Sequence, residues 1–446
     1  MLPPRTTAEI PITGARLSSV VPGTVRGENK DRELTNMDLA LKFHYIKGLY
    51  FFYNNNTTQN IITIEELKKP MFELLDRFFP VAGRIRRSEA DNPYIKCNDA
   101  GVRIIEAYCE EFTVEECLDM VEMGYSFHDR LCYNHVLGPD LGFSPLVLLQ
   151  VTWFKCGGVS VGLSWAHILG DIASASTFMN TWAHIMSGHV PKESIHITSP
   201  IRPYNFSNVI ATKPFSVKEL NPPVENNWSL PTNNNGQNMR TRCFKVSAKQ
   251  LNLLMSNTCG KKATNFTRFE IISSVIWKSL SQLRKNSLSS KVVTICWYQN
   301  PSGDSNDQVI PNNKSMVLST VERDSEVNNV SELAFLISER KIVENEAINN
   351  EEMIGKMDFL VYGANLTFVN LEDVEIYEFE MKGKRPVFAN FSIEGVGKEG
   401  LVLVQTKGPK NGNKEDDING RIVTVVLPED ELAHLENELK TNWNIA

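Results

Sequence analysis

The 446-residue sequence lacks the features of a membrane-spanning, secreted or nucleic-acid-binding protein. No stretch reaches about 18 consecutive apolar residues, the length at which a membrane-spanning helix is expected. The first 21 residues lack the continuous apolar run of a secretory signal, so we expect a cytoplasmic protein whose membrane association is at most peripheral. The formal net charge of −7 is unfavourable for binding nucleic acid, because phosphate binding requires clustered Lys and Arg.

Cysteine spacing matches neither a disulfide framework nor a metal site. The eight cysteines are scattered along the chain, and none forms a CxxC pair. Because no secretory signal is visible, we expect free thiols in a reducing compartment. We also expect no bound metal, because no third ligand accompanies the pair formed by His167 and Asp171.

Length and composition predict two globular domains. The chain exceeds the roughly 250–300 residues at which single hydrophobic cores stop growing. Apolar residues make up 42% and charged residues 22%, as in ordinary globular proteins. The segment from Pro191 to about Gln237 is rich in Pro, Asn and Ser and shows little periodicity. We therefore predict an N-terminal domain over 1–190, a crossover linker over 191–240 and a C-terminal domain over 241–446.

Alternating strand and helix patterns predict an α/β fold. Apolar runs at 146–154 and 159–165, joined by a Lys-Cys-Gly-Gly turn, predict a hairpin. A helix beginning at Thr35 or Asn36 is predicted to carry Leu39, Phe43 and Ile46 on one face. Further helices are predicted at 64–79, 172–186, from Thr267 and from about Pro428, and further strands at 241–246, 292–297, 401–406 and 421–427.

The run from Ser164 to Asp171 places a histidine and a carboxylate after the second hairpin strand. Histidine has an unperturbed pKa of about 6.5, so it can exchange protons near neutral pH. His167 is therefore a candidate general base, and a purely structural role for it stays an alternative. Asp171 stands where a helix N-cap belongs, and such a cap contributes about 0.5–2 kcal/mol.

The chain resembles the plant BAHD acyltransferase family, whose marker HxxxD is here His167 to Asp171. The resemblance covers nearly the whole chain and includes Leu34–Asp38, Phe79–Arg84 and Tyr362–Thr367. It implies a two-domain α/β fold of the chloramphenicol-acetyltransferase type, with mixed sheets flanked by helices and a central channel past His167. It further implies that His167 is the general base that activates an alcohol or amine for attack on an acyl-CoA thioester. Asp171 would hold local structure through a basic partner, and no cofactor would be permanently bound.

More narrowly, the chain looks like the Eceriferum/Glossy branch of cuticular wax biosynthesis. The segments that carry this resemblance are 16–22, 135–141, 154–158 and 164–171. Members of the branch are implicated in elongating very-long-chain acyl-CoA beside the condensing enzyme of the elongase. The resemblance thus implies acyl-CoA and a membrane-bound condensing enzyme as partners, with peripheral placement at the endoplasmic reticulum through that enzyme.

Two departures from the family pattern bear on His167. Ile172 follows the motif aspartate where the family usually has glycine, and Ala166 precedes His167 where a second histidine is frequent. The second family marker, DFGWG, is replaced by Glu378–Pro386, with Glu380 in the place of its aspartate. Three functions therefore stay open: an accessory factor of elongation, an acyl-CoA-dependent O- or N-acyltransferase, and an acyl-CoA carrier.

Three short basic groups are candidates for contact with CoA phosphates, although a solvated surface is the default for such small groups. They are Lys261-Lys262, Arg284-Lys285 and Lys382-Lys384-Arg385.

Overall fold

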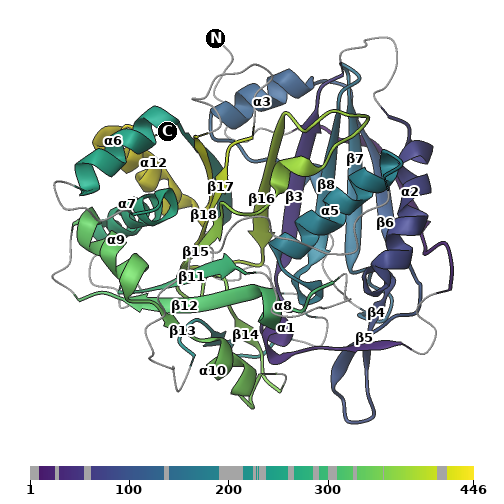
Figure 1. Cartoon of the computed structure of the whole chain (residues 1–446), viewed down its shortest axis with the longest axis horizontal. Coiled ribbons are helices and arrows are strands. Elements are labelled where there is room, and N and C mark those ends of the chain that lie inside the picture. Colours follow the sequence, from purple (N-terminus) through teal and green to yellow (C-terminus); the bar gives the residue numbers. More distant parts are fainter. Residues whose placement is uncertain are drawn as a thin grey trace.

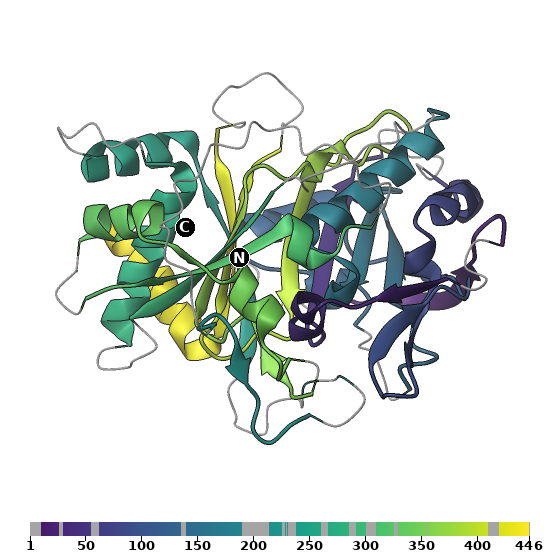
Figure 2. The ribbon, with the colours of Figure 1, turned by 60° about the horizontal axis from the view of Figure 1, so that its bottom comes forward.

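The computed structural model consists of two large mixed β-sheets with helices packed on their faces (Figures 1 and 2). It describes residues 10–25, 30–54, 62–134, 140–189, 214–224, 228, 230, 238–259, 266–284, 291–299, 309–324, 329–354, 356–408 and 419–445. The predicted α/β class with mixed sheets is confirmed.

The first sheet has the strand order β1-β6-β7-β8-β3-β16. Its strands are β1 (Thr13–Val20), β6 (Val102–Cys109), β7 (Val147–Phe154), β8 (Val159–Ala166), β3 (Tyr45–Phe52) and β16 (Phe388–Glu394). Helices α2 (Ile64–Arg77) and α5 (Ile172–Met186) pack against each other over this sheet (Figure 1). Helix α3 (Val114–Glu122) contacts β10 (Met239–Val246) of the second sheet, and α4 (His128–Leu131) contacts β3, β7 and β8.

The predicted hairpin is β7 and β8, which pair antiparallel. Its turn is closed by the Phe154 N–H, which donates to the Gly158 carbonyl at 2.9 Å, and Gly157 takes the positive φ of 74° that the turn requires. Every residue of both strands is buried, as expected for strands in the middle of a covered sheet. His167 follows directly after β8 and is thereby held at the end of the sheet.

The second sheet has the strand order β10-β18-β17-β15-β11-β12-β13. Its strands are β10 (Met239–Val246), β18 (Arg421–Pro428), β17 (Leu401–Thr406), β15 (Leu366–Leu371), β11 (Val292–Tyr298), β12 (Met316–Glu322) and β13 (Ile342–Val343). Helices α6 (Ala248–Cys259), α7 (Arg268–Leu283), α9 (Val330–Glu339) and α12 (Glu429–Trp443) gather on its outer face (Figure 1). As predicted, Thr267 begins α7, in a capping box with Glu270.

One strand crosses from the second half of the chain into the first sheet. β16 pairs antiparallel with β3, with Phe388 opposite Phe51 and Glu394 opposite Tyr45. Without β16, β3 would be an open sheet edge, which folded proteins usually cover. The part of the chain after the predicted boundary at 240/241 therefore contributes one strand to the first sheet. The three-part division of the chain stays a prediction, and most of the predicted linker lies outside the described residues.

A buried glutamine of the second sheet joins it to this strand. The Gln405 side chain on β17 donates to the Ala389 carbonyl at 2.8 Å and accepts from the Phe391 N–H at 3.2 Å. Both contacts satisfy polar groups of β16 on the side away from β3. The Gln405 side chain of the second sheet is thereby hydrogen-bonded to the backbone of the first sheet.

One predicted helix is much shorter than expected. Thr35 caps α1 (Asn36–Ala40) in a capping box with Asp38, but the helix ends before Phe43 and Ile46. Ile46 lies instead in β3, opposite Trp165 of β8. The helical spacing of these apolar residues was therefore misleading: the aromatic-rich run that follows is buried as a strand on all sides.

Short elements complete the fold around the two large sheets. Two small sheets are formed by β2 (Asp31–Glu33), β5 (Pro93–Lys96) and β4 (Arg84–Arg87), and by β14 (Phe359–Leu360) and β9 (Lys218–Glu219). The short helical segments are η1 (Phe79–Ala82), η2 (His167–Leu169), α8 (Asn312–Ser315), α10 (Asn345–Asn350) and η4 (Ile376–Glu378).

Candidate active site

His167 is held by its backbone from both halves of the chain. Its N–H donates to the His44 carbonyl at 3.1 Å, just before β3 begins. Its carbonyl accepts from the Asn312 side-chain amide at 2.8 Å, at the start of α8. The position of the imidazole therefore depends on contacts that are far apart in the sequence.

The His167 imidazole is fully buried and makes a hydrogen bond to a tyrosine. Its Nε2 lies 2.9 Å from the Tyr362 hydroxyl oxygen, and the two ring centroids are 5.5 Å apart. The exposed fraction of both residues is 0%. Burial lowers the pKa of His167 to about 4, because a low-dielectric surrounding disfavours the charged imidazolium. The ring is therefore neutral at pH 7, the protonation state that a general base needs.

Tyr362 is positioned by a second buried histidine. Nε2 of His44 accepts from the backbone N–H groups of Val361 and Tyr362, each at 3.3 Å. The His44 and Tyr362 rings meet edge to face with centroids 4.8 Å apart. Burial and the neighbouring His167 lower the pKa of His44 to about 3, so this imidazole is also neutral. Acceptance of two N–H groups by Nε2 requires its lone pair and agrees with that state.

Asp171 is the N-cap of α5. Its Oδ1 accepts from the Ser174 N–H at 2.8 Å, which satisfies one of the free donors at the helix start. Burial raises the pKa of this carboxyl above its ordinary value. Within the described part of the chain, no Lys or Arg forms an ion pair with Asp171, so the basic partner that the family resemblance implies is not present there.

The sequence analysis did not predict four buried polar residues of the site, which are His44, Tyr362, Asp38 and Asn312. Oδ1 of Asp38 accepts from the Asn312 backbone N–H at 3.0 Å and from its side-chain amide at 2.8 Å. The same amide donates to the His167 carbonyl. Asp38 therefore holds the Asn312 side chain that in turn holds the His167 backbone. In the sequence, Asp38 stands out only as the last residue of the family segment Leu34–Asp38 and as part of a predicted helix start. No local signal could reveal its contact with a residue 274 positions away.

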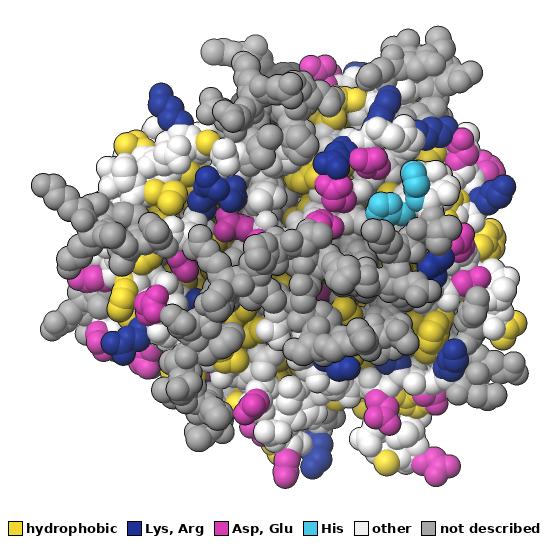
Figure 3. Space-filling view, viewed as in Figure 1, with side chains coloured by type: hydrophobic (Ala, Val, Ile, Leu, Met, Phe, Trp, Pro, Cys, Tyr) yellow, Lys and Arg dark blue, Asp and Glu magenta, His cyan; other side chains and the backbone are white. Residues whose placement is uncertain are grey.

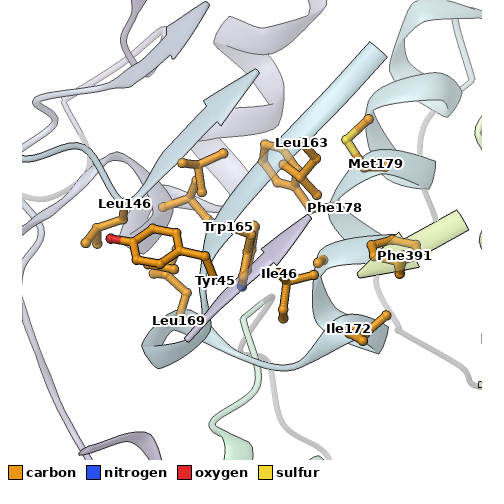
Figure 4. Close-up of a cluster of buried hydrophobic side chains, with 14 of the residues drawn as sticks. Tyr45, Ile46, Leu146, Leu163, Trp165, Leu169, Ile172, Phe178, Met179 and Phe391 are labelled. Atoms are coloured by element: carbon orange, nitrogen blue, oxygen red, sulfur yellow. The ribbon is translucent and has the colours of Figure 1, made fainter. Parts of the chain in front are cut away.

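A layer of large apolar side chains lies under the motif (Figure 4). Trp165 and Phe178 are both fully buried there, with ring centroids 5.5 Å apart. The Trp165 indole N–H donates to the Gly170 carbonyl at 3.1 Å, inside the motif turn. Ile172, the residue that replaces the family's glycine, is buried in the same cluster. The bulky residue is thus accommodated by core packing.

In the part of the chain that the structure describes, the His167 imidazole does not line an open channel. The Tyr362 ring lies against Nε2, the atom that would face a substrate, and neither ring is accessible to solvent. One cavity of about 300 Å³ lies elsewhere, lined on one side by Glu115, Asp119 and Glu122 of α3. His167 is not among the residues that line it.

The segment that replaces the second family marker is a tight hairpin. Met381 and Lys384 exchange two backbone hydrogen bonds of 2.9 Å around Lys382 and Gly383, whose φ angles of 48° and 73° match a type I′ turn. The Arg385 guanidinium binds Glu380 at 2.9 Å and Glu378 at 2.7 Å. This hairpin lies shortly before β16, which begins at Phe388 and pairs with β3.

Four of the seven residues predicted to contact CoA phosphates are described, and three of these four, Arg284, Lys382 and Arg385, form ion pairs. Arg284 binds Glu431 and Glu399, and Lys382 binds Glu66 at 2.8 Å. Lys261, Lys262 and Lys285 lie outside the described residues. Where described residues form the face in Figure 3, basic and acidic side chains are interspersed. The structure therefore does not single out a phosphate site among these groups.

The described residues contain no group of three or more His, Cys, Asp or Glu side chains arranged to hold a metal ion. Over the same residues, the longest apolar helices are too short or too polar to cross a bilayer.

Comparison of the sequence with known proteins identifies the family. Residues 11–299 match the Transferase family model. Protein ECERIFERUM 2 of Arabidopsis thaliana is 42% identical over 441 residues, covering 96% of this chain and 98% of that protein. Protein ECERIFERUM 26 of the same plant is 35% identical over 440 residues, covering 96% of each chain.

Comparison with solved structures supports the fold. Vinorine synthase matches over 96% of this chain and 98% of its own, with a TM-score of 0.65 and 18% identity. TRI101 of F. graminearum, complexed with ethyl coenzyme A, matches over 93% and 98%, with a TM-score of 0.67 and 13% identity. Both likenesses concern the fold alone, and they confirm the acyltransferase-type architecture predicted from the sequence. The chain therefore belongs to the Transferase family, the BAHD acyltransferases with the HxxxD motif, and within it to the ECERIFERUM branch.

Proposed function

We propose that this protein promotes the elongation of very-long-chain fatty acyl-CoA for cuticular wax as an accessory partner of a membrane-bound condensing enzyme. The similarity to ECERIFERUM 2 and ECERIFERUM 26 over nearly the full chain supports the branch and hence the role. The proposed place of action is the cytoplasmic surface of the endoplasmic reticulum, reached through the condensing enzyme.

The observation that carries the non-catalytic form of this proposal is the contact between His167 and Tyr362. A general base must have its nitrogen within hydrogen-bond reach of the substrate hydroxyl. Here Nε2 is bound to Tyr362 at 2.9 Å, and both side chains are fully buried. A histidine in that state has no room for an alcohol or amine acceptor, so the elongation role would not depend on acyl transfer at His167.

Acyl-CoA is the proposed small-molecule ligand. TRI101 is described in complexes with ethyl coenzyme A and with coenzyme A, and it shares this fold. In this proposal, acyl-CoA is transferred to or from the condensing enzyme and is not bound as a permanent cofactor.

Co-expression with an elongase condensing enzyme tests the proposal. Wild type, His167→Ala and His128→Ala would be compared by profiling acyl chain lengths. His128 is the matched control, because it is also fully buried and burial lowers its pKa to about 4. We expect both folded variants to keep the shift towards longer products. Selective loss of the longest products in a folded His167→Ala protein would refute the non-catalytic form, and no shift with wild type would refute the accessory role.

A second candidate is an acyl-CoA-dependent O- or N-acyltransferase with His167 as general base and Asp171 as the residue that holds the motif. The neutral state of the imidazole at pH 7 favours it, since a general base must be unprotonated before it takes a proton. It predicts CoA release from long-chain acyl-CoA with some hydroxyl or amine acceptor, and loss of that release in His167→Ala. Absence of turnover across a broad acceptor panel would count against it. Saturable acyl-CoA binding without turnover would favour a carrier instead.

A further inference from the structure

We propose that Tyr362 is a built-in occupant of the acceptor position and that its side chain blocks acyl transfer at His167. This inference rests on the proposed accessory function and names the residue that keeps the inherited site inactive. The block is supplied by the second half of the chain, whereas the motif belongs to the first.

The first argument is the geometry of the hydroxyl. A general base takes a proton from an oxygen that lies about 2.6–3.2 Å from its nitrogen. The Tyr362 oxygen lies 2.9 Å from Nε2 of His167, where the oxygen of an acceptor alcohol would have to be. Both residues have an exposed fraction of 0%, so neither water nor an acceptor reaches Nε2 while the phenol is there.

The second argument is that the phenol is fixed in place. His44 accepts the backbone N–H of Tyr362 and packs edge to face against its ring. On its other side, the Tyr362 hydroxyl lies 3.6 Å from the Met316 sulfur. Burial raises the pKa of Tyr362 well above its ordinary value, so the phenol stays protonated and is a poor nucleophile itself. Tyr362 therefore occupies the position without reacting.

Removal of the ring would restore the geometry for chemistry. The vacated space exceeds the roughly 30 Å³ that one water takes up in the liquid. A water bound to Nε2 could then attack the thioester carbonyl of acyl-CoA while His167 takes its proton. The C–S bond breaks, the CoA thiolate leaves, and the imidazolium returns a proton to the sulfur. The products are CoA thiol and a free fatty acid; an alcohol in place of water would yield an ester.

The test measures thiol release from stearoyl-CoA by the purified full-length protein. We expect Tyr362→Ala to release CoA at least about tenfold faster than wild type, within the range that general base catalysis contributes. The double variant Tyr362→Ala/His167→Ala should return to the wild-type rate. Tyr362→Phe, which keeps the ring, should stay inactive. Tyr50→Ala is the matched control, because Tyr50 is equally buried but packs against Phe379 and Phe391.

The proposal would be overturned if Tyr362→Ala and Tyr50→Ala released CoA at equal rates. It would also be overturned if the double variant Tyr362→Ala/His167→Ala released CoA as fast as Tyr362→Ala. So would a folded Tyr362→Ala protein without release. If this variant does not fold, wild type itself provides the test through diethyl pyrocarbonate, which modifies accessible imidazoles. His167 should stay unmodified while the exposed His184 reacts. Equal modification of both in the folded protein would show that Nε2 is not blocked.

The chain-length profile separates this inference from the proposed function. If wild type fails to lengthen products beside a condensing enzyme, the accessory role fails whatever Tyr362 does. If wild type lengthens them but Tyr362→Ala releases no CoA, the accessory role stands and only the block at Tyr362 is refuted.

Discussion

Acidification from pH 7 to pH 5 should destabilise the folded protein through its buried histidines. His44, His128 and His167 are all fully buried, and burial lowers their pKa values to about 3, 4 and 4 from an ordinary 6.5. As the pH falls below 6.5, the unfolded chain binds protons that the folded chain does not. The free energy of unfolding therefore decreases through this range, and the loss is complete only below about pH 3, the pKa of His44.

The size of the effect follows from the distance between pH 5 and the unfolded pKa. One pKa unit corresponds to about 1.4 kcal/mol, and pH 5 lies about 1.5 units below 6.5. Each histidine should therefore cost about 2 kcal/mol between pH 7 and pH 5. Three together should cost about 6 kcal/mol, a large part of the roughly 5–15 kcal/mol that stabilises most native proteins.

Urea unfolding at pH 7, 6 and 5, followed by tryptophan fluorescence, measures this dependence. His167→Asn and His128→Asn should each weaken the pH dependence by about 2 kcal/mol, whatever their effect at pH 7. His128 lies on α4, and its ring is hydrogen-bonded to Ser126 at 2.8 Å. Its variant therefore measures the effect of burying a histidine outside the HxxxD motif. Variants that follow the same pH course as wild type would refute the argument from burial.

Predictions at four other positions concern helix caps, buried hydrogen bonds and surface ion pairs. Asp171→Ala should lower the free energy of unfolding by about 0.5–2 kcal/mol, and Asp171→Asn by less, because asparagine also caps a helix; thermal melts at pH 7 compare them. Since burial raises the pKa of Asp171, its ionisation opposes folding as the pH rises above 3.8, whereas the buried histidines favour folding as the pH rises; Asp171→Asn should therefore make stability increase more steeply between pH 4 and 7. Gln405→Leu should cost about 1–3 kcal/mol for each of the two β16 backbone groups left unpaired, measured by urea unfolding, and a cost near zero would contradict the bridge. Thr267→Ala should cost about 0.5–2 kcal/mol through the lost cap of α7, whereas the solvent-exposed ion pairs of Arg385 should contribute less than about 1 kcal/mol in Arg385→Ala.

Local patterns in the sequence were sufficient for the elements that surround the motif. Alternating apolar strands with a Gly-Gly turn predicted β7 and β8, and Asp171 before a helical pattern predicted the N-cap of α5. These predictions succeed because turn geometry, capping and periodicity depend on residues close together in the chain. The same reasoning was wrong for Ile46. Its helical spacing predicted a helix, but Ile46 lies in β3, which pairs with β8.

Only the tertiary structure decided what surrounds the imidazole. The tyrosine that binds His167 lies 195 positions further along the chain, and Asp38 contacts the same site through Asn312. β16 likewise enters the first sheet from the far half of the chain. Contacts of this kind depend on how two sheets pack and exchange a strand, and no local pattern encodes them. The sequence by itself determined that the protein carries an acyltransferase motif on an α/β framework. What lies next to the nitrogen of that motif was decided by packing, because the buried Tyr362 hydroxyl comes within 2.9 Å of it from the second half of the chain.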